Sequence, residues 1–213
     1  ASRGMVAISA EYRVKSRNGT SPYECATDGK SAVRWIRQHS KELGVDPDRI
    51  AAGGGSAGGH VAAATATLKS FDDPAEDQKI SSKPNALVLF NPVFDNGPGG
   101  YGHDRVKDRW KEFSPMHNIA KGVPPTIVFL GSKDDLIPVS TAKEYKKRML
   151  EAGSRCDIWI YEGRPHGFFN NNDKGSACYH STVFHADKFL TSLGYLEGAP
   201  TIQDEQVDAK LLP

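Results

Sequence analysis

The stretch RIAAGGGSAGGH, residues 49–60, decides the fold and permits two interpretations. Counted from residue 53, it matches G-x-G-x-x-G, the loop that binds the pyrophosphate of a dinucleotide. Counted from residue 54, it matches G-x-S-x-G, the sharp turn that presents a nucleophilic serine, here Ser56. Both interpretations require a strand before the stretch and a helix after it. The evidence that distinguishes them therefore has to come from the rest of the sequence.

Short apolar runs alternate with helical patterns on both sides of this stretch. Strands are predicted at 4–12, 49–54, 85–92, 123–132 and 156–163, and helices at 23–43, 57–69, 140–153 and 175–196. Nearly continuous apolar strands that alternate with helices indicate a mostly parallel sheet with helices on both faces. The predicted fold class is therefore α/β.

The length of 213 residues suits a single domain, which is predicted over residues 1–197. A Gly-rich, charged excursion at 95–118 interrupts the alternation, either as a small lid or as a long connection. Residues 198–213 carry little pattern and are predicted to be an irregular tail.

The composition is ordinary, with 38% hydrophobic residues, 25% charged residues and a formal net charge of +1. No basic run indicates a nucleic-acid partner, and no apolar stretch is long enough to span a membrane. The three cysteines form an odd set without C-x-x-C spacing, which favours a reducing compartment, and the cytoplasm is the default expectation. The abrupt start at Ala1 leaves any targeting signal out of view.

The dinucleotide interpretation needs an acidic residue about 20 positions after the glycines, at the end of a second strand. Asp72 and Asp73 lie at that distance, but within the polar run KSFDDPAEDQ, which has no apolar strand before it. A Walker-type phosphate loop is excluded because no Gly-Lys-Ser/Thr follows the glycines. The sequence therefore predicts no cofactor.

The serine interpretation needs an acid and then a histidine, each after a later strand. Asp134 follows the predicted strand at 123–132, and His166 follows the one at 156–163. Asp135 is the alternative acid, because it directly follows Asp134. Order and context both fit, so the sequence predicts a catalytic Ser56, Asp134 and His166.

The chemistry explains why these residue types occur together. A serine hydroxyl needs a base to remove its proton, and His166 would supply that base and later protonate the leaving alcohol. Asp134 would hold the imidazole in the correct tautomer. The backbone N–H of Ala57, at a helix N-terminus, would bind the developing oxyanion. His60 is predicted to pack and not to react, and no His/Glu spacing indicates a metal site.

Four motifs together resemble the α/β-hydrolase superfamily, in particular its esterase/lipase branch of hormone-sensitive-lipase-like and acetyl-esterase-like proteins. The motifs are EYRV at 11–14, GGGSAGGHVAA at 53–63, GSKDDLIP at 131–138 and PHGFFN at 165–170. The resemblance implies a serine carboxylesterase that hydrolyses small, short-chain esters through an acyl-enzyme. The alternatives are a serine peptidase of the same fold and a non-catalytic scaffold derived from a hydrolase.

One departure from that family concerns the oxyanion site. The family places a His-Gly-Gly-Gly-like loop before the strand that corresponds to EYRV, and this chain begins after that position. The loss of an oxyanion donor costs on the order of 10²–10³ in rate, so weak activity of this chain alone is expected. An absent neighbouring strand would also leave an open sheet edge, through which copies of the chain could pair as a homo-oligomer.

Overall fold

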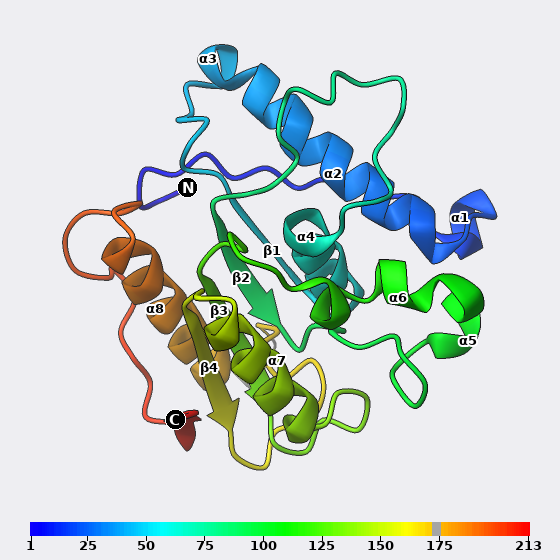
Figure 1. The fold of residues 1–213 in the computed structure, drawn as a ribbon. Coiled ribbons are helices and arrows are strands. Elements are labelled where there is room, and N and C mark those ends of the chain that lie inside the picture. The colour runs from blue at the N-terminus through cyan, green and yellow to red at the C-terminus, as the bar shows by residue number, and fades with distance from the viewer. Residues whose placement is uncertain (172–175) are drawn as a thin grey trace.

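The computed structural model describes residues 1–171 and 176–213, which fold around one five-stranded sheet (Figure 1). Its strands are β1 (Ala51–Gly55), β2 (Ala86–Phe90), β3 (Thr126–Gly131), β4 (Cys156–Tyr161) and β5 (Ala209–Leu211). They lie side by side in that order, and the first four are parallel, whereas β5 runs antiparallel to β4. The predicted α/β class with a mostly parallel sheet is confirmed.

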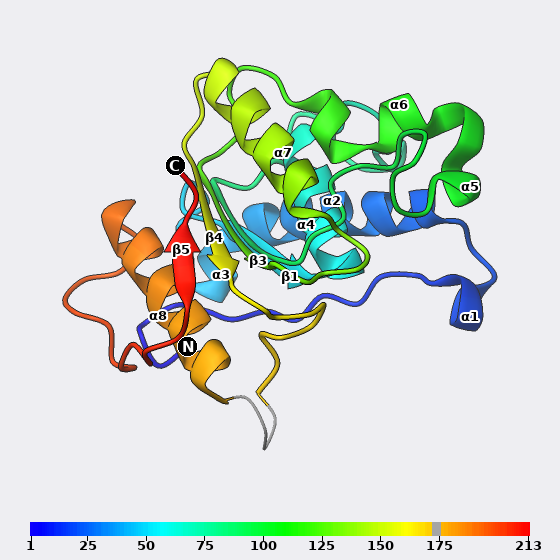
Figure 2. The ribbon, with the colours of Figure 1, turned by 90° about the horizontal axis from the view of Figure 1, so that it is seen from below.

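The helices cover both faces of this sheet. They are α1 (Lys15–Asn18), α2 (Pro22–Gln38), α3 (Ser40–Leu43), α4 (Ala57–Thr67), α5 (His103–Val106), α6 (Trp110–Phe113), α7 (Val139–Glu151) and α8 (Ser176–Ser192), with 3₁₀ turns η1 (Lys107–Arg109) and η2 (Pro115–Asn118). Each parallel strand lies beside the one before it, so right-handed crossovers place α4 and α7 on one face. The helix α8 lies on the other face (Figure 2). Gly175, the predicted first residue of that helix, is outside the described residues.

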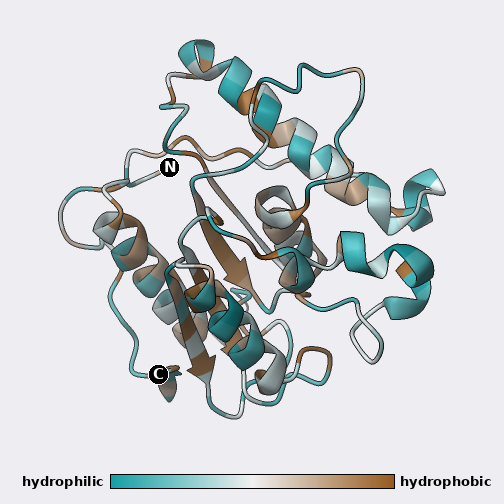
Figure 3. Cartoon of the chain, viewed as in Figure 1, coloured by the Kyte–Doolittle hydropathy of each residue, from teal (hydrophilic) through white to brown (hydrophobic). Residues whose placement is uncertain are grey.

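The strand β2, with the sequence ALVLF, is apolar throughout and is brown in Figure 3. Leu87 and Leu89 of β2 pack with α4 and α7, whereas Ala86 and the partly buried Phe90 pack with α8. Because successive side chains of a strand point to opposite faces, a sheet covered on both sides needs such continuous apolar runs.

The helix α4 follows Ser56 directly and is buried along most of its length, from Gly59 to Thr67. Its alanines pack on the sheet on one side and against α2 on the other. Small side chains let the helix approach both neighbours closely, and a helix that is apolar all round is typical of a buried one. The residue before α4 is therefore held by a rigid core element.

The predicted strand at 4–12 does not form. The segment is extended and mostly exposed, and it makes no strand ladder with any described residue. Its ends are held by ion pairs, from Arg3 to Asp187 at 2.7 Å and from Arg13 to Asp28 at 2.6 Å. The apolar pattern predicted the extended backbone, but a strand also needs a partner at hydrogen-bonding distance.

The C-terminal residues also differ from the sequence prediction. Within the predicted irregular tail at 198–213, residues 209–211 form β5, because their backbone pairs with the outer edge of β4. At the other end of the sheet, β1 pairs with β2, and no described residue pairs with its second edge. The association of copies through an open edge stays a prediction.

Candidate active site

The three predicted catalytic residues lie together at one end of the sheet. Ser56 follows β1, Asp134 lies just after β3, and His166 lies in the loop after β4. Parallel strands bring their carboxyl ends to the same edge, where α/β proteins place their binding sites. His166 Nε2 lies 2.9 Å from Ser56 Oγ, and His166 Nδ1 lies 2.8 Å from Asp134 Oδ2. The structure thus joins three separate motifs in one hydrogen-bonded chain.

The turn at Ser56 is backbone-strained and closely packed. Ser56 has φ 53° and ψ −116°, a conformation that non-glycine residues rarely adopt. Its N–H donates to the Phe90 carbonyl at 2.9 Å, which fixes the turn to the end of β2. A Cβ atom on Gly54 would lie 2.6 Å from the carbonyl carbon of Gly58, so only glycine fits there. The turn therefore presents the Ser56 hydroxyl at the edge of the sheet.

Ala57 is the first residue of α4 and is exposed. The first N–H groups of a helix have no partner inside the helix, and the helix dipole places partial positive charge there. An anion beside Ser56 would therefore meet a suitable donor in the Ala57 N–H. This is the place that the sequence predicted for an oxyanion donor.

The carboxylate of Asp134 is fully buried and accepts several hydrogen bonds. Its Oδ1 accepts from the N–H groups of Leu136 and Ile137, both at 2.9 Å. Its Oδ2 accepts from His166 and from the side-chain amide of Asn91. Asp135 is exposed and has no comparable environment, so the geometry selects Asp134 over its neighbour.

Sequence reasoning missed Asn91. This residue directly follows β2, is completely buried, and has φ 41°. Its Nδ2 donates to Asp134 Oδ2, while its Oδ1 has no partner among the described residues. The one available signal was a polar residue at the carboxyl end of a predicted strand.

The acid loop and the histidine loop lie directly against each other. Lys133 N donates to the Arg164 carbonyl at 3.0 Å, and a Cβ on Gly131 would lie 2.2 Å from that same oxygen. The glycine that ends β3 therefore permits the approach that brings His166 to Asp134.

The remaining histidines of this region are held by hydrogen bonds. His60 is buried in α4, and its Nε2 lies 3.0 Å from Asn96 Oδ1. Burial lowers the pKa of His60 to about 4, so its imidazole is neutral at physiological pH. Its ring packs on Phe113 with centroids 4.4 Å apart, which confirms the predicted packing role. His103 and His117 are hydrogen-bonded to the Asn96 carbonyl and to the Ser114 hydroxyl, respectively.

A small pocket of about 90 Å³ begins at Ala57 and extends under the excursion at 95–118. Most of its lining is apolar, and it comprises Tyr12, Pro22, Cys25, Ala57, His60, Val61, Val93, Asn96, Tyr101, Gly102, Arg105, Val106 and Phe113. None of these residues comes from the acid loop or the histidine loop. The pocket therefore adjoins the N-terminus of α4, next to Ser56, and neither His166 nor Asp134 lines it.

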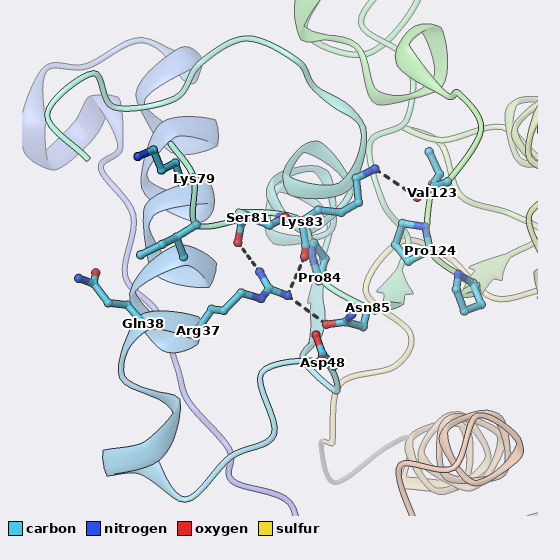
Figure 4. A pocket seen from close by; sticks show the side chains of 13 residues that line it. Arg37, Gln38, Asp48, Lys79, Ser81, Lys83, Pro84, Asn85, Val123 and Pro124 are labelled. Carbon is cyan, nitrogen blue, oxygen red and sulfur yellow. Dashed lines mark hydrogen bonds between the residues drawn. The ribbon is translucent and has the colours of Figure 1, made fainter. Parts of the chain in front are cut away.

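A second, wider pocket of about 850 Å³ lies at the opposite end of the sheet, where Asn85 precedes β2 and Pro125 precedes β3 (Figure 4). The guanidinium of Arg37 dominates it, and four protein acceptors already bind this group. These acceptors are the carbonyls of Pro47, Ser81 and Lys83 and the side-chain oxygen of Asn85. Arg37 thus connects the loop before β1 with the loop before β2 through its hydrogen bonds. The pocket is remote from Ser56.

Within residues 1–171 and 176–213, no group of three or more His, Cys, Asp or Glu side chains is placed to hold a metal ion. In the same part of the chain, no helix combines the length and the apolar character needed to cross a membrane.

Known families and proteins resemble this chain over nearly its whole length. The BD-FAE family matches residues 1–96, and the dienelactone hydrolase family matches residues 98–192. The apo form of esterase 2 from Thermogutta terrifontis is 44% identical, with a TM-score of 0.87, over 92% of this chain and 75% of that one. Two curated relatives are more distant.

Esterase LipC of Mycobacterium tuberculosis is 27% identical over 79% of this chain and 46% of its own length. The acetylxylan esterase of Xylanibacter ruminicola is 24% identical over 78% of this chain and 35% of its own length. The chain thus spans less than half the length of these two relatives. The likeness to esterase 2 is the stronger one, because it combines identity, fold and coverage. Together with the geometry around Ser56, it shows that the chain belongs to the α/β-hydrolase esterase family.

Proposed function

We propose that this protein is a serine carboxylesterase that hydrolyses short-chain esters through an acyl-enzyme. One observation carries the proposal. His166 Nε2 lies 2.9 Å from Ser56 Oγ, while the buried Asp134 accepts from the opposite ring nitrogen at 2.8 Å. That arrangement leaves the Nε2 lone pair directed at the serine hydroxyl, which is what a general base requires.

In the first step, Ser56 Oγ attacks the ester carbonyl carbon while His166 Nε2 takes the hydroxyl proton. Negative charge then develops on the carbonyl oxygen, where the Ala57 N–H and the N-terminal end of α4 stabilise it. Collapse of the tetrahedral intermediate breaks the bond to the alcohol oxygen, and the imidazolium of His166 returns the proton to that oxygen. The acyl group remains on Ser56.

In the second step, a water molecule replaces the alcohol and loses its proton to His166. The resulting tetrahedral intermediate releases the carboxylic acid and restores the Ser56 hydroxyl. Asp134 keeps the imidazole in one orientation through both steps, and Asn91 in turn fixes that carboxylate through its hydrogen bond.

The pocket at Ala57 supports short acyl chains. The leaving alcohol has to lie near His166, and the pocket is lined by Ala57 but not by His166, so we assign it to the acyl chain. Its volume of about 90 Å³ corresponds to roughly three water molecules, which suits a few carbon atoms. Thermogutta esterase 2 has been solved in propionate-bound and butyrate-bound forms, which agrees with a preference for short acyl groups.

The test is hydrolysis of p-nitrophenyl acetate by the wild type and by Ser56→Ala, with thermal melting to establish that both are folded. We expect activity in the wild type and background rates in the variant. A second arm uses paraoxon, which phosphorylates esterase 2. Mass spectrometry should place one diethylphosphoryl group on the Ser56 peptide of the wild type and none on the variant. Background hydrolysis by both proteins would contradict the proposal.

A further inference from the structure

The acyl pocket proposed above contains one charged side chain, Arg105. The buried residues Val106, Phe113 and His60 form its inner wall, whereas Arg105 is exposed and therefore lies at its rim. The His60 imidazole is neutral, so the guanidinium is the one formal charge of the lining. An apolar pocket with a single cation at its entrance favours a ligand with an apolar body and an anionic end.

The guanidinium of Arg105 is also available for a ligand. It lies over the ring of Tyr101 at 5.3 Å, and no carboxylate among the described residues forms an ion pair with it. The nearby Arg109 differs, because it pairs with Glu112 at 2.8 Å and lies over the ring of Phe71 at 4.5 Å. Stacking on Tyr101 orients Arg105 and leaves its N–H donors free for a carboxylate.

We propose that Arg105 selects acyl groups that end in a carboxylate, so that preferred substrates are half-esters of short dicarboxylic acids. The ester carbonyl would lie at Ser56 and the Ala57 N–H, the methylene groups would fill the apolar pocket, and the terminal carboxylate would reach Arg105 at the rim. The products are the alcohol and a free dicarboxylate. This inference rests on the proposed esterase activity, because it assigns a substrate class to the same site.

The experiment compares two p-nitrophenyl esters with five-carbon acyl groups, the neutral valerate and the anionic hemiglutarate. Spontaneous hydrolysis is subtracted with Ser56→Ala. We expect Arg105→Gln to lower the ratio of kcat/KM for the hemiglutarate to kcat/KM for the valerate roughly two- to five-fold, as is typical of one exposed ion pair. Arg105→Lys should retain most of the preference, and about 1 M NaCl should weaken it in the wild type.

Arg109→Gln is the matched control, since it removes the same charge from the same segment but from a residue outside the pocket. An unchanged ratio between the two esters in Arg105→Gln would overturn the assignment, and so would an equal loss in Arg109→Gln. Hydrolysis of the valerate without any effect of Arg105 would leave the esterase function standing and refute only the anion preference. Hydrolysis of neither five-carbon ester would refute the half-ester assignment, and only additional inactivity towards p-nitrophenyl acetate would refute the esterase function.

Discussion

At the residue scale, the chemistry of the site depends on the hydrogen bonds that the Asp134 carboxylate accepts. Both oxygens of its carboxylate accept hydrogen bonds, one from two backbone N–H groups and the other from His166 and Asn91. A buried carboxylate with these donors stays in one position and has no freedom to rotate. The imidazole that it holds is therefore fixed with Nδ1 protonated and Nε2 free to accept the serine proton.

Asp134→Asn should lower kcat for p-nitrophenyl acetate by about 10⁴, with little change in fold. In either orientation of the new amide, its NH₂ group faces a group that is itself a hydrogen-bond donor. An NH₂ group that faces His166 also forces the imidazole into the wrong tautomer, in which Nδ1 accepts and Nε2 carries the proton. Asp135→Asn is the matched control, because the neighbouring carboxylate is exposed, and it should keep nearly full activity. Equal losses in both variants, or a larger loss at residue 135, would contradict this assignment of the acid.

Ser56, Asp134 and His166 could be predicted because each belongs to a recognisable motif that follows an apolar strand. Asn91 could not, since an Asn after a strand is also typical of a turn. Its role depends on β2 lying directly beside β3, which brings residue 91 to the acid loop. That adjacency belongs to the tertiary structure, and no local pattern encodes it.

At the scale of elements, the site depends on the turn from β1 to α4. Two backbone segments pass very close there, at Gly54 and Gly58, and neither can move without shifting the strand or the helix. The buried helix α4 has no room to move away, since it contacts both the sheet and α2. The conformation of Ser56 is thus imposed by the packing on either side of it.

Gly54→Ala should therefore lower the free energy of unfolding by roughly 3 kcal/mol and impair ester hydrolysis, because the added Cβ would lie 2.6 Å from backbone. Gly58→Ala tests the other glycine of the same motif. Its Cβ would meet nothing closer than Tyr12 Oη at 4.0 Å, and alanine favours the helix by about 1 kcal/mol over glycine. Urea unfolding of both variants checks the contrast, and a stable Gly54→Ala would disprove the steric argument.

The elements that the sequence pattern predicted wrongly are those whose partners lie far away in the chain. The apolar run at 4–12 indicated an extended backbone, but no strand pairs with it in the described structure. The reverse holds for residues 209–211, which carry no strong pattern and become a strand because the edge of β4 is open to them. The parallel strands and long helices were predictable, since their own apolar faces demand burial.

At the scale of the whole molecule, folding pairs several buried charged side chains with opposite charges, whereas His60 is buried beside a neutral partner. Lys30 and Arg34 of α2 are buried, but Asp72 and Glu76 form ion pairs with them. His60 is equally buried, and among residues 1–171 and 176–213 its one side-chain hydrogen-bond partner is the neutral Asn96. Its protonation in the folded protein therefore has no compensating charge, and that links global stability to pH.

Burial lowers the pKa of His60 from 6.5 to about 4, so the unfolded chain binds its proton at a higher pH than the folded protein does. This contribution to stability is complete above pH 6.5 and is lost as the pH falls towards 4, by up to roughly 3 kcal/mol. Urea unfolding between pH 4 and 8 should show this fall in the wild type, and His60→Gln should flatten it. His39→Gln, which alters a histidine stacked on the exposed Trp35, should retain the wild-type slope. If His60→Gln kept that slope as well, a different group would have to carry the pH dependence.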